Sequence, residues 1–181
     1  MSETLLEAEK HASTDALTGL QNRRSLLKNG RHFLNKHRRR KEHLTALFLD
    51  IDYFKAINDT YGHPFGDEVL RRFADVIRSS IRPSDFCSRY GGEEFLVLLG
   101  QADAAAGEEI SKRIMEKLCH LRFEENKCFS FTTSIGVFSA IPTEEDTLED
   151  FIERSDHALY CAKHKGRNRI CFYSPDCSTE T

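Results

Sequence analysis

Arg89-Tyr90-Gly91-Gly92-Glu93-Glu94-Phe95 is the segment of this chain from which the fold can be inferred. Short apolar segments lie on both sides of it, at 86–89 and 95–99. Two consecutive glycines between such segments favour a tight turn, so we expect a β-hairpin in the middle of the chain. Upstream, residues 44–51 are nearly all apolar, which is typical of a strand buried on both faces. We expect this strand to lie beside the hairpin.

Outward from the hairpin, helical and strand patterns alternate along the chain. Because a tight hairpin interrupts this alternation, we predict an α+β fold with a central, mostly antiparallel five-stranded sheet flanked by helices. The expected helices are 23–36, a short turn at 54–58, 66–81, one carrying Ile110, Ile114 and Leu118, and one over 148–162, and the further strands are 129–137 and 170–173.

The composition is that of a one-domain globular protein and argues against a nucleic-acid binder and a membrane-spanning chain. With 181 residues, of which 39% are hydrophobic and 30% charged, the chain is long enough for one domain with a substantial core. A net charge of −3 argues against a nucleic-acid binder, and the basic cluster at 36–41 is explained as well by a solvated helix end. No apolar run has the length of a membrane helix, and the N-terminus lacks the features of a signal peptide. We expect a cytoplasmic location, or tethering to a membrane by upstream segments.

Three segments describe the expected organisation. Residues 1–13 have helical spacing and are expected to form the end of a longer stem helix. Residues 14–174 form the folded domain, and 175–181 a flexible tail. The six cysteines show neither a CxxC pair nor zinc-ligand spacing, so we expect reduced thiols and no disulfide framework.

Carboxylates occur at the end of the apolar strand 44–51 and in the turn of the hairpin. Asp50 ends that strand, and Glu93 and Glu94 belong to the turn. Residues two apart in a strand share a face, so Asp52 could point to the same side as Asp50. Such a cluster is costly unless a cation neutralises it, and Mg²⁺ prefers oxygen ligands. We predict an enzyme that uses Mg²⁺, or alternatively Mn²⁺, to act on phosphates. Taken alone, Asp50 or Asp52 would more simply be a solvated acid at a strand end.

The hairpin stretch resembles the signature of the GGDEF family of diguanylate cyclases, in its Glu-Glu form. The resemblance extends in order over about residues 14–173 and implies a nucleotidyl cyclase or palm-like fold. The other matching segments are 15–20 with 22–24, 50–55, 58–63 with 66–67, 134–137, and 158–163 with 166–168.

The resemblance implies a reaction in which two GTP molecules are condensed into cyclic di-GMP and two pyrophosphates are released. Asp50, Glu93 and the Ile51 carbonyl would hold the metal ions. Glu93 is also the candidate for assisting deprotonation of the ribose 3′-hydroxyl, although a metal can lower the pKa of that hydroxyl without a separate base. Glu94 would support the site.

The resemblance also assigns contacts with the guanine base. Asn58 and Asp67 would read its edge, and His63 would lie close to the nucleotide. Adenine cannot offer the donors that Asp67 would accept, so the wrong base would leave the carboxylate unpaired. The alternative explanation of Asp67 is an acid favoured by the dipole at a helix N-terminus.

Four residues would contact the triphosphate by the same resemblance. Phe54 and Lys55 begin the short helix after Asp50, where backbone N–H groups can face phosphate. Lys163 and Arg167 are four residues apart, a spacing that places both on one face of a helix end. The alternative is a cationic last turn favoured by the helix dipole.

Arg82-Pro83-Ser84-Asp85 matches the family's RxxD motif in sequence and in its distance from the hairpin. In relatives that carry it, this motif binds cyclic di-GMP away from the active site and inhibits turnover. Arg113 resembles a secondary arginine of that site. The alternative is an ordinary turn after a helix.

The expected partners follow from the expected reaction. One domain offers one nucleotide site, whereas the product joins two nucleotides, so catalysis would need a homodimer. The stem helix would help to form it, and an upstream sensory or regulatory domain would precede the stem. GTP is the expected substrate, cyclic di-GMP the product and inhibitor, and no nucleic acid is expected. The alternative function is a catalytically silent sensor of GTP or cyclic di-GMP.

Overall fold

The computed structural model describes residues 13–124, 126 and 128–175. Its elements, in chain order, are β1 (Gln21–Asn22), α2 (Arg23–Arg40), β2 (Leu44–Ile51), α3 (Phe54–Tyr61), α4 (His63–Arg78), β3 (Phe86–Arg89), β4 (Glu94–Gly100), α5 (Ala104–His120), β5 (Thr133–Ala140), α6 (Leu148–His164) and β6 (Ile170–Phe172). The expected stem at 1–13 and tail at 175–181 lie almost wholly outside the described residues.

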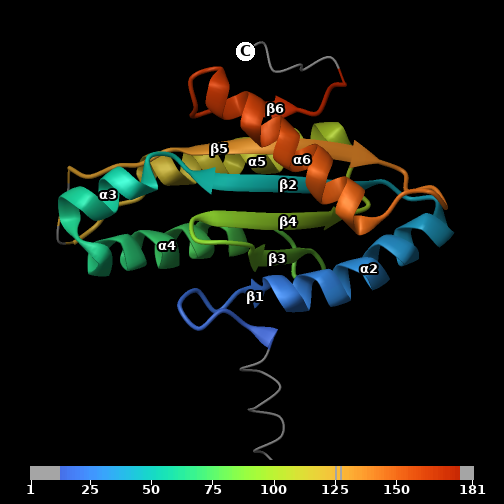
Figure 1. Ribbon diagram of the computed structural model, residues 1–181, viewed down its shortest axis with the longest axis horizontal. Helices are drawn as coiled ribbons and strands as arrows, with labels where there is room; N and C mark the ends of the chain where they lie inside the picture. The colour runs from blue at the N-terminus through green and yellow to red at the C-terminus, as the bar shows by residue number, and fades with distance from the viewer. Residues whose placement is uncertain (1–12, 125, 127, 176–181) are drawn as a thin grey trace, which may run out of the picture.

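The strands form one sheet in the order β1-β3-β4-β2-β5-β6 (Figure 1). The inner strands β3, β4, β2 and β5 pair antiparallel, and the edge strands β1 and β6 join in parallel. The mostly antiparallel α+β fold is therefore confirmed. The expected count of five strands was wrong, because β1 has only two residues and no alternation that a sequence pattern could reveal.

Strand β2 lies in the centre of the sheet and is buried over its whole length, as expected. Its side chains alternate between two hydrophobic cores. Leu47 and Leu49 pack with α3, α4 and α5 on one face. Ala46 and Phe48 pack with α2 and α6 on the other face. In Figure 1, α6 crosses in front of the sheet and α5 lies behind it.

Close packing at Gly136 holds α6 against the sheet. A Cβ atom built there would lie 2.0 Å from the Ser155 carbonyl oxygen and 2.2 Å from the Leu159 nitrogen. Both neighbours are backbone atoms of α6, so only glycine allows this approach of helix and strand.

The start of α6 is set by Thr147, which forms a capping box with Asp150.

Several helix boundaries differ from the sequence expectation. Helix α2 continues to Arg40 instead of ending near residue 36, because the left-handed Lys41 donates its N–H to the carbonyls of Arg38 and His37. Helix α4 spans His63–Arg78 instead of 66–81, and its first turn contains a proline, which suits that position. The strand expected over 129–137 begins only at Thr133.

Two further findings concern membrane-spanning helices and the state of the cysteines. Among the described residues, no helix is both long and apolar enough to cross a membrane. Cys87, Cys119, Cys128 and Cys171 carry free thiols, as expected, whereas Cys161 is disulfide-bonded, which the sequence interpretation missed.

Candidate active site

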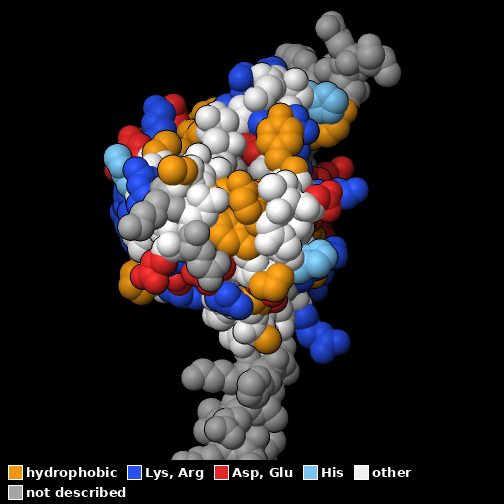
Figure 2. Space-filling view, turned by 90° about the vertical axis from the view of Figure 1, so that its left-hand side faces the viewer, with side chains coloured by type: hydrophobic (Ala, Val, Ile, Leu, Met, Phe, Trp, Pro, Cys, Tyr) orange, Lys and Arg blue, Asp and Glu red, His pale blue; other side chains and the backbone are white. Residues whose placement is uncertain are grey.

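The end of β2 and the turn between β3 and β4 meet at one edge of the sheet. Asp50 pairs in register with Glu94, and the Ile51 N–H donates to the Glu93 carbonyl at 3.4 Å. The turn itself is closed by bonds from the N–H groups of Tyr90 and Gly91 to the Glu94 carbonyl. This end of the molecule, where α3 begins, faces the viewer in Figure 2, which shows hydrophobic side chains near the centre of the face and most charged side chains toward its edges.

Asp50 is a buried carboxylate next to a cation and two further acids. Its side chain lies 2.9 Å from Lys163 Nζ, on α6. Burial raises the pKa of Asp50 to about 6, the Lys163 ammonium opposes that rise, and the charges of Glu93 and Glu94 add to it. The structure therefore brings together the three acids that the sequence predicted.

Glu94 folds back under the glycines of the turn. A Cβ atom at Gly91 would lie 2.6 Å from Glu94 Oε2, so a side chain at position 91 would displace the Glu94 carboxylate. Gly92 has no atom within 4 Å of such a Cβ, so its surroundings are open. Burial, and then the charge of Asp156, raises the pKa of Glu94. Gly91 therefore packs against the Glu94 carboxylate, whereas the space beside Gly92 is open.

Asp52 lies on the same side of the sheet as Asp50, because its carboxylate accepts from the hydroxyl of Ser134, the residue that pairs with Asp50 in register. The extended conformation ends at Ile51, and Asp52 is only 2% exposed. Its carboxylate accepts hydrogen bonds from the hydroxyls of Thr132 and Ser134 and from the Asn168 backbone N–H. These bonds occupy both of its oxygens.

The first turn of α3 presents backbone N–H groups without a side-chain cap. Its N-cap, Tyr53, is left-handed at φ 57° and makes no capping hydrogen bond. Phe54 is buried and anchors the helix, whereas the Lys55 side chain is exposed. An uncapped helix start carries partial positive charge, so this turn can accept an anion.

Lys163 and Arg167 both lie near the end of β2 and the start of α3, but they belong to different local structures. Lys163 lies in the last turn of α6, whereas Arg167 lies three residues beyond the end of that helix, in a left-handed conformation at φ 60°. The prediction that both lie on one helix face was therefore wrong. The Arg167 guanidinium lies 4.6 Å from the centre of the Tyr53 ring, which keeps it near the start of α3.

Asn58 and Asp67 come from neighbouring helices. Asn58 Oδ1 lies so close to α4 that a Cβ atom at Gly66 would be 1.9 Å away. Asp67 follows Gly66 and is half-buried, so the two predicted base-reading residues lie at the same junction of α3 and α4. His63 is the exposed first residue of α4.

Arg82 and Asp85 share a turn between α4 and β3. The Asp85 carboxylate accepts from the backbone N–H groups of Arg82 and Gly100, while the Arg82 side chain is exposed. Arg113, on α5, donates to the Ser80 carbonyl two residues before this turn. The three residues predicted for an inhibitory site thus lie in one region, in which Asp85 directly precedes β3 of the hairpin.

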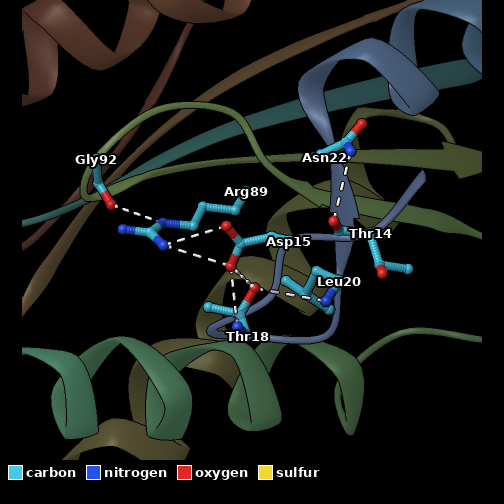
Figure 3. Close-up of polar contacts among 7 residues, drawn as sticks. All are labelled: Thr14, Asp15, Thr18, Leu20, Asn22, Arg89 and Gly92. Atoms are coloured by element: carbon cyan, nitrogen blue, oxygen red, sulfur yellow. Dashed lines mark hydrogen bonds and ion pairs between the residues drawn. The ribbon is translucent and has the colours of Figure 1, made fainter. Parts of the chain in front are cut away.

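A second charged contact joins the start of the domain to the hairpin (Figure 3). Arg89 Nη1 lies 3.2 Å from Asp15 Oδ2, and Arg89 Nε donates to the Gly92 carbonyl at 2.9 Å. Burial acts to raise the pKa of Asp15, but hydrogen bonds from Thr18 and the Arg89 guanidinium outweigh it and lower the pKa. Asp15 is therefore a charged anchor for the turn that carries the acids.

Two residues near the site were missed from the sequence. The Arg23 guanidinium, at the start of α2, lies 4.5 Å from the centre of the Tyr90 ring in the hairpin turn. Asp156 raises the pKa of Glu94 through its charge, and burial raises its own pKa. Asp156 and Lys163 are seven apart on α6, a helical spacing that could have suggested a shared face.

The donor set suits a hard divalent cation. Asp50 and Glu93 offer carboxylate oxygens and Ile51 a carbonyl, and Mg²⁺ accepts such ligands while keeping several waters. Burial is the main cause of the raised pKa of Asp50 and the charges of Glu93 and Glu94 add to it, and a bound cation would favour the charged form of this carboxyl. No group of three or more His, Cys, Asp or Glu side chains within the described residues could hold a metal alone. A metal here would need oxygens from a ligand or water.

Comparisons with known proteins agree with this geometry. The family described as "Diguanylate cyclase, GGDEF domain" matches residues 12–169. Diguanylate cyclase A of Treponema denticola is 39% identical over 162 residues, which are 87% of this chain and 43% of that relative. The chain therefore spans less than half of that relative's length.

Two solved structures are similar in fold as well as in sequence. The coiled coil and GGDEF domain of DgcB from Caulobacter crescentus, in complex with c-di-GMP, has a TM-score of 0.87 and 30% identity over 94% of this chain and 90% of that one. The active GGEEF domain of a diguanylate cyclase from Vibrio cholerae has a TM-score of 0.79 and 36% identity over 86% of this chain and 98% of that one. Sequence, fold and the arrangement of acids and cations agree, and the chain belongs to the GGDEF domain family of diguanylate cyclases.

Proposed function

We propose that this domain condenses two GTP molecules into cyclic di-GMP with release of two pyrophosphates. The observation that carries the proposal is the meeting of acids and cations at the end of β2. Asp50 lies between Lys163 on one side and the charges of Glu93 and Glu94 on the other. Carboxylates suit a metal-bound triphosphate, and the cations suit its phosphate oxygens.

Asp50, Glu93 and the Ile51 carbonyl would hold Mg²⁺ or Mn²⁺. When bound, the cation would stabilise charge on the attacked α-phosphate and on the leaving pyrophosphate. The Lys163 ammonium lies 2.9 Å from Asp50 Oδ2 and opposes the rise in the pKa of that carboxyl. Its charge would also suit a phosphate oxygen of the bound nucleotide.

The remaining residues would bind and orient GTP. The uncapped N–H groups at Phe54 and Lys55, with Arg167 above Tyr53, would hold the phosphates. The Asn58 amide would hydrogen-bond the guanine edge and the Asp67 carboxylate would accept from its donors, and a base of the wrong pattern would leave that carboxylate unpaired. Since GTP is a cytoplasmic nucleotide, the domain would act in the cytoplasm.

Two copies of the domain would be needed for one turnover. Each copy binds one GTP, and each ribose 3′-hydroxyl attacks the α-phosphate bound by the other copy. The similar DgcB structure includes a coiled coil, and residues 1–13 of this chain would belong to a comparable stem. An upstream sensory or regulatory domain in the whole protein is part of this proposal.

Cyclic di-GMP would also bind at Arg82, Asp85 and Arg113 and inhibit turnover. The exposed Arg82 guanidinium suits a guanine edge or a phosphate, and Asp85 suits base donors. Calorimetry with cyclic di-GMP would test this site: Arg82→Ala should weaken binding by about tenfold or more. Arg71→Ala, which removes an exposed arginine on α4, should bind like the wild type. Equal binding by Arg82→Ala and wild type would contradict the assignment.

The direct test is the product. The purified chain is incubated with GTP and Mg²⁺, and nucleotides are separated by chromatography. Wild type should yield cyclic di-GMP and pyrophosphate, and Glu93→Ala should yield neither. Glu108→Ala, which removes a half-buried α5 acid paired with Lys112, should behave as wild type. Absence of product from a dimer that still binds GTP would instead favour a silent sensor.

A further inference from the structure

The Asp52 carboxylate is buried beside the candidate site, yet the proposed chemistry does not use it. Thr132 Oγ1 donates to Asp52 Oδ2 at 2.6 Å, and Ser134 Oγ donates to Oδ1 at 2.7 Å. The Asn168 backbone N–H donates to Oδ2 at 3.0 Å. All three donors are neutral, so the carboxylate is stabilised by hydrogen bonds and not by an ion pair with any of these partners. A buried charge kept in this way needs an explanation.

Its third partner lies in the turn between α6 and β6, and this turn is conformationally unusual. Gly166, Arg167 and Asn168 follow one another at φ 108°, 60° and 46°. Arg167 and Asn168 are not glycines, and non-glycine residues are uncommon in the left-handed region unless the surrounding structure holds them there. The bond from the Asn168 N–H to Asp52 is one such restraint, and the bond from the Arg167 N–H to the Ala162 carbonyl is another.

Two more contacts join this part of the chain to the end of β2 and the start of α3, one from the last turn of α6 and one from the turn that follows it. Lys163 Nζ lies 2.9 Å from Asp50 Oδ2, and the Arg167 guanidinium lies 4.6 Å from the centre of the Tyr53 ring. Asp52 sits between Asp50 and Tyr53, and is the most buried of the three. It therefore forms the inner contact between the segment that offers metal ligands and the segment that offers phosphate cations.

We propose that Asp52 is a positioning residue that fixes the α6–β6 turn, so that Lys163 and Arg167 face the triphosphate of the bound nucleotide. The inference rests on the proposed function. Asp52 acts through its acceptor geometry, which shapes the phosphate end of the site and leaves the guanine end, at Asn58 and Asp67, unaffected. The competing role is a metal ligand, for which the negative charge itself would be needed.

Asparagine separates these two roles. Its amide oxygen can accept from Thr132 and Asn168, and its amide nitrogen can donate to the Ser134 hydroxyl, which can rotate to accept. Asp52→Asn thus keeps the contacts and removes the charge. Asp52→Ala removes both, and Asp52→Glu keeps the charge but displaces the oxygens.

The experiment measures equilibrium binding to the full chain in Mg²⁺ of two probes. One is 3′-deoxy-GTP, which lacks the attacking hydroxyl, and the other is GMP, which lacks the outer phosphates. We expect Asp52→Asn to bind both within about threefold of wild type, and Asp52→Ala and Asp52→Glu to lose about tenfold for 3′-deoxy-GTP alone. Thr45→Val, which removes buried hydrogen bonds at the far end of β2, should change neither affinity.

The outcomes decide between the roles. Loss of 3′-deoxy-GTP binding in Asp52→Asn would overturn the geometric role in favour of the charge. Equal weakening of both probes in Asp52→Ala or Asp52→Glu would also overturn it, since the effect would not be confined to the phosphates. If Asp52→Ala does not fold, the contrast between Asp52→Asn and Asp52→Glu still decides. Binding needs no turnover, so failure of the wild type to make cyclic di-GMP would count against the proposed function separately.

Discussion

At the scale of single residues, Asp50 couples the site to pH. Burial raises the pKa of Asp50 from 3.8 to about 6, against the opposing effect of Lys163. The folded protein therefore holds this proton more tightly than the unfolded chain does. The contribution of Asp50 to the free energy of unfolding is greatest below pH 3.8 and is lost as the pH rises to about 6, by roughly 3 kcal/mol.

Asp50→Asn should remove this dependence. In metal-free urea unfolding at about pH 4 and about pH 7, the wild type should lose roughly 3 kcal/mol more stability over that interval than Asp50→Asn. Glu108→Gln, at a half-buried position on α5, should follow the wild type. The same pH dependence in Asp50→Asn and wild type would show that another group is responsible.

Gly66 is a second residue whose effect is local. Because a Cβ atom there would lie 1.9 Å from Asn58 Oδ1, Gly66→Ala should push the Asn58 side chain aside. We expect GTP affinity to fall by about tenfold, with a smaller effect on ATP, for which Asn58 makes no matched contact. In an Asn58→Ala background the added methyl should cost much less, and additive effects in the four variants of this cycle would refute the explanation.

At the scale of elements, sequence patterns located the long helices and strands because each buries a continuous face. They failed where a partner decides the structure. Strand β1 exists through its pairing with β3, and Arg167 leaves the helix because its turn is anchored elsewhere. The acids and cations of the site were found through motifs, whereas the contacts of Asp52 and of Arg23 depend on distant segments that no local pattern specifies.

The contact of α6 with β5 gives a prediction at this scale. Gly136→Ala would place a methyl against backbone atoms at 2.0 and 2.2 Å, so α6 must move off the sheet. We expect a loss of about 3 kcal/mol in the free energy of unfolding, measured by urea titration. Gly92→Ala, where no atom lies within 4 Å, should cost far less. Equal stability of the two variants would show that α6 relaxes without cost.

At the scale of the whole molecule, the proposed reaction would make a single copy of the site half of a catalyst. We expect the rate per protomer to rise with protein concentration and to level off as dimers form, because each turnover needs two facing sites. Light scattering on the same samples would measure the dimer fraction, and fusion of a parallel coiled coil before residue 1 should remove the dependence. A rate per protomer that is constant in samples shown to be monomeric would contradict the half-site proposal.

The central place of β2 also has a consequence for synthesis on the ribosome. One edge of β2 pairs with β4 and the other with β5, whose residues, Thr133–Ala140, are translated much later. During synthesis, the apolar strand β2 therefore has backbone groups on one edge that stay unpaired until β5 is made, and such an unpaired edge favours aggregation. Helix α2, translated just before β2, carries many Lys and Arg side chains and no acid. Its charge would act as a gatekeeper for the emerging strand until β5 closes the sheet.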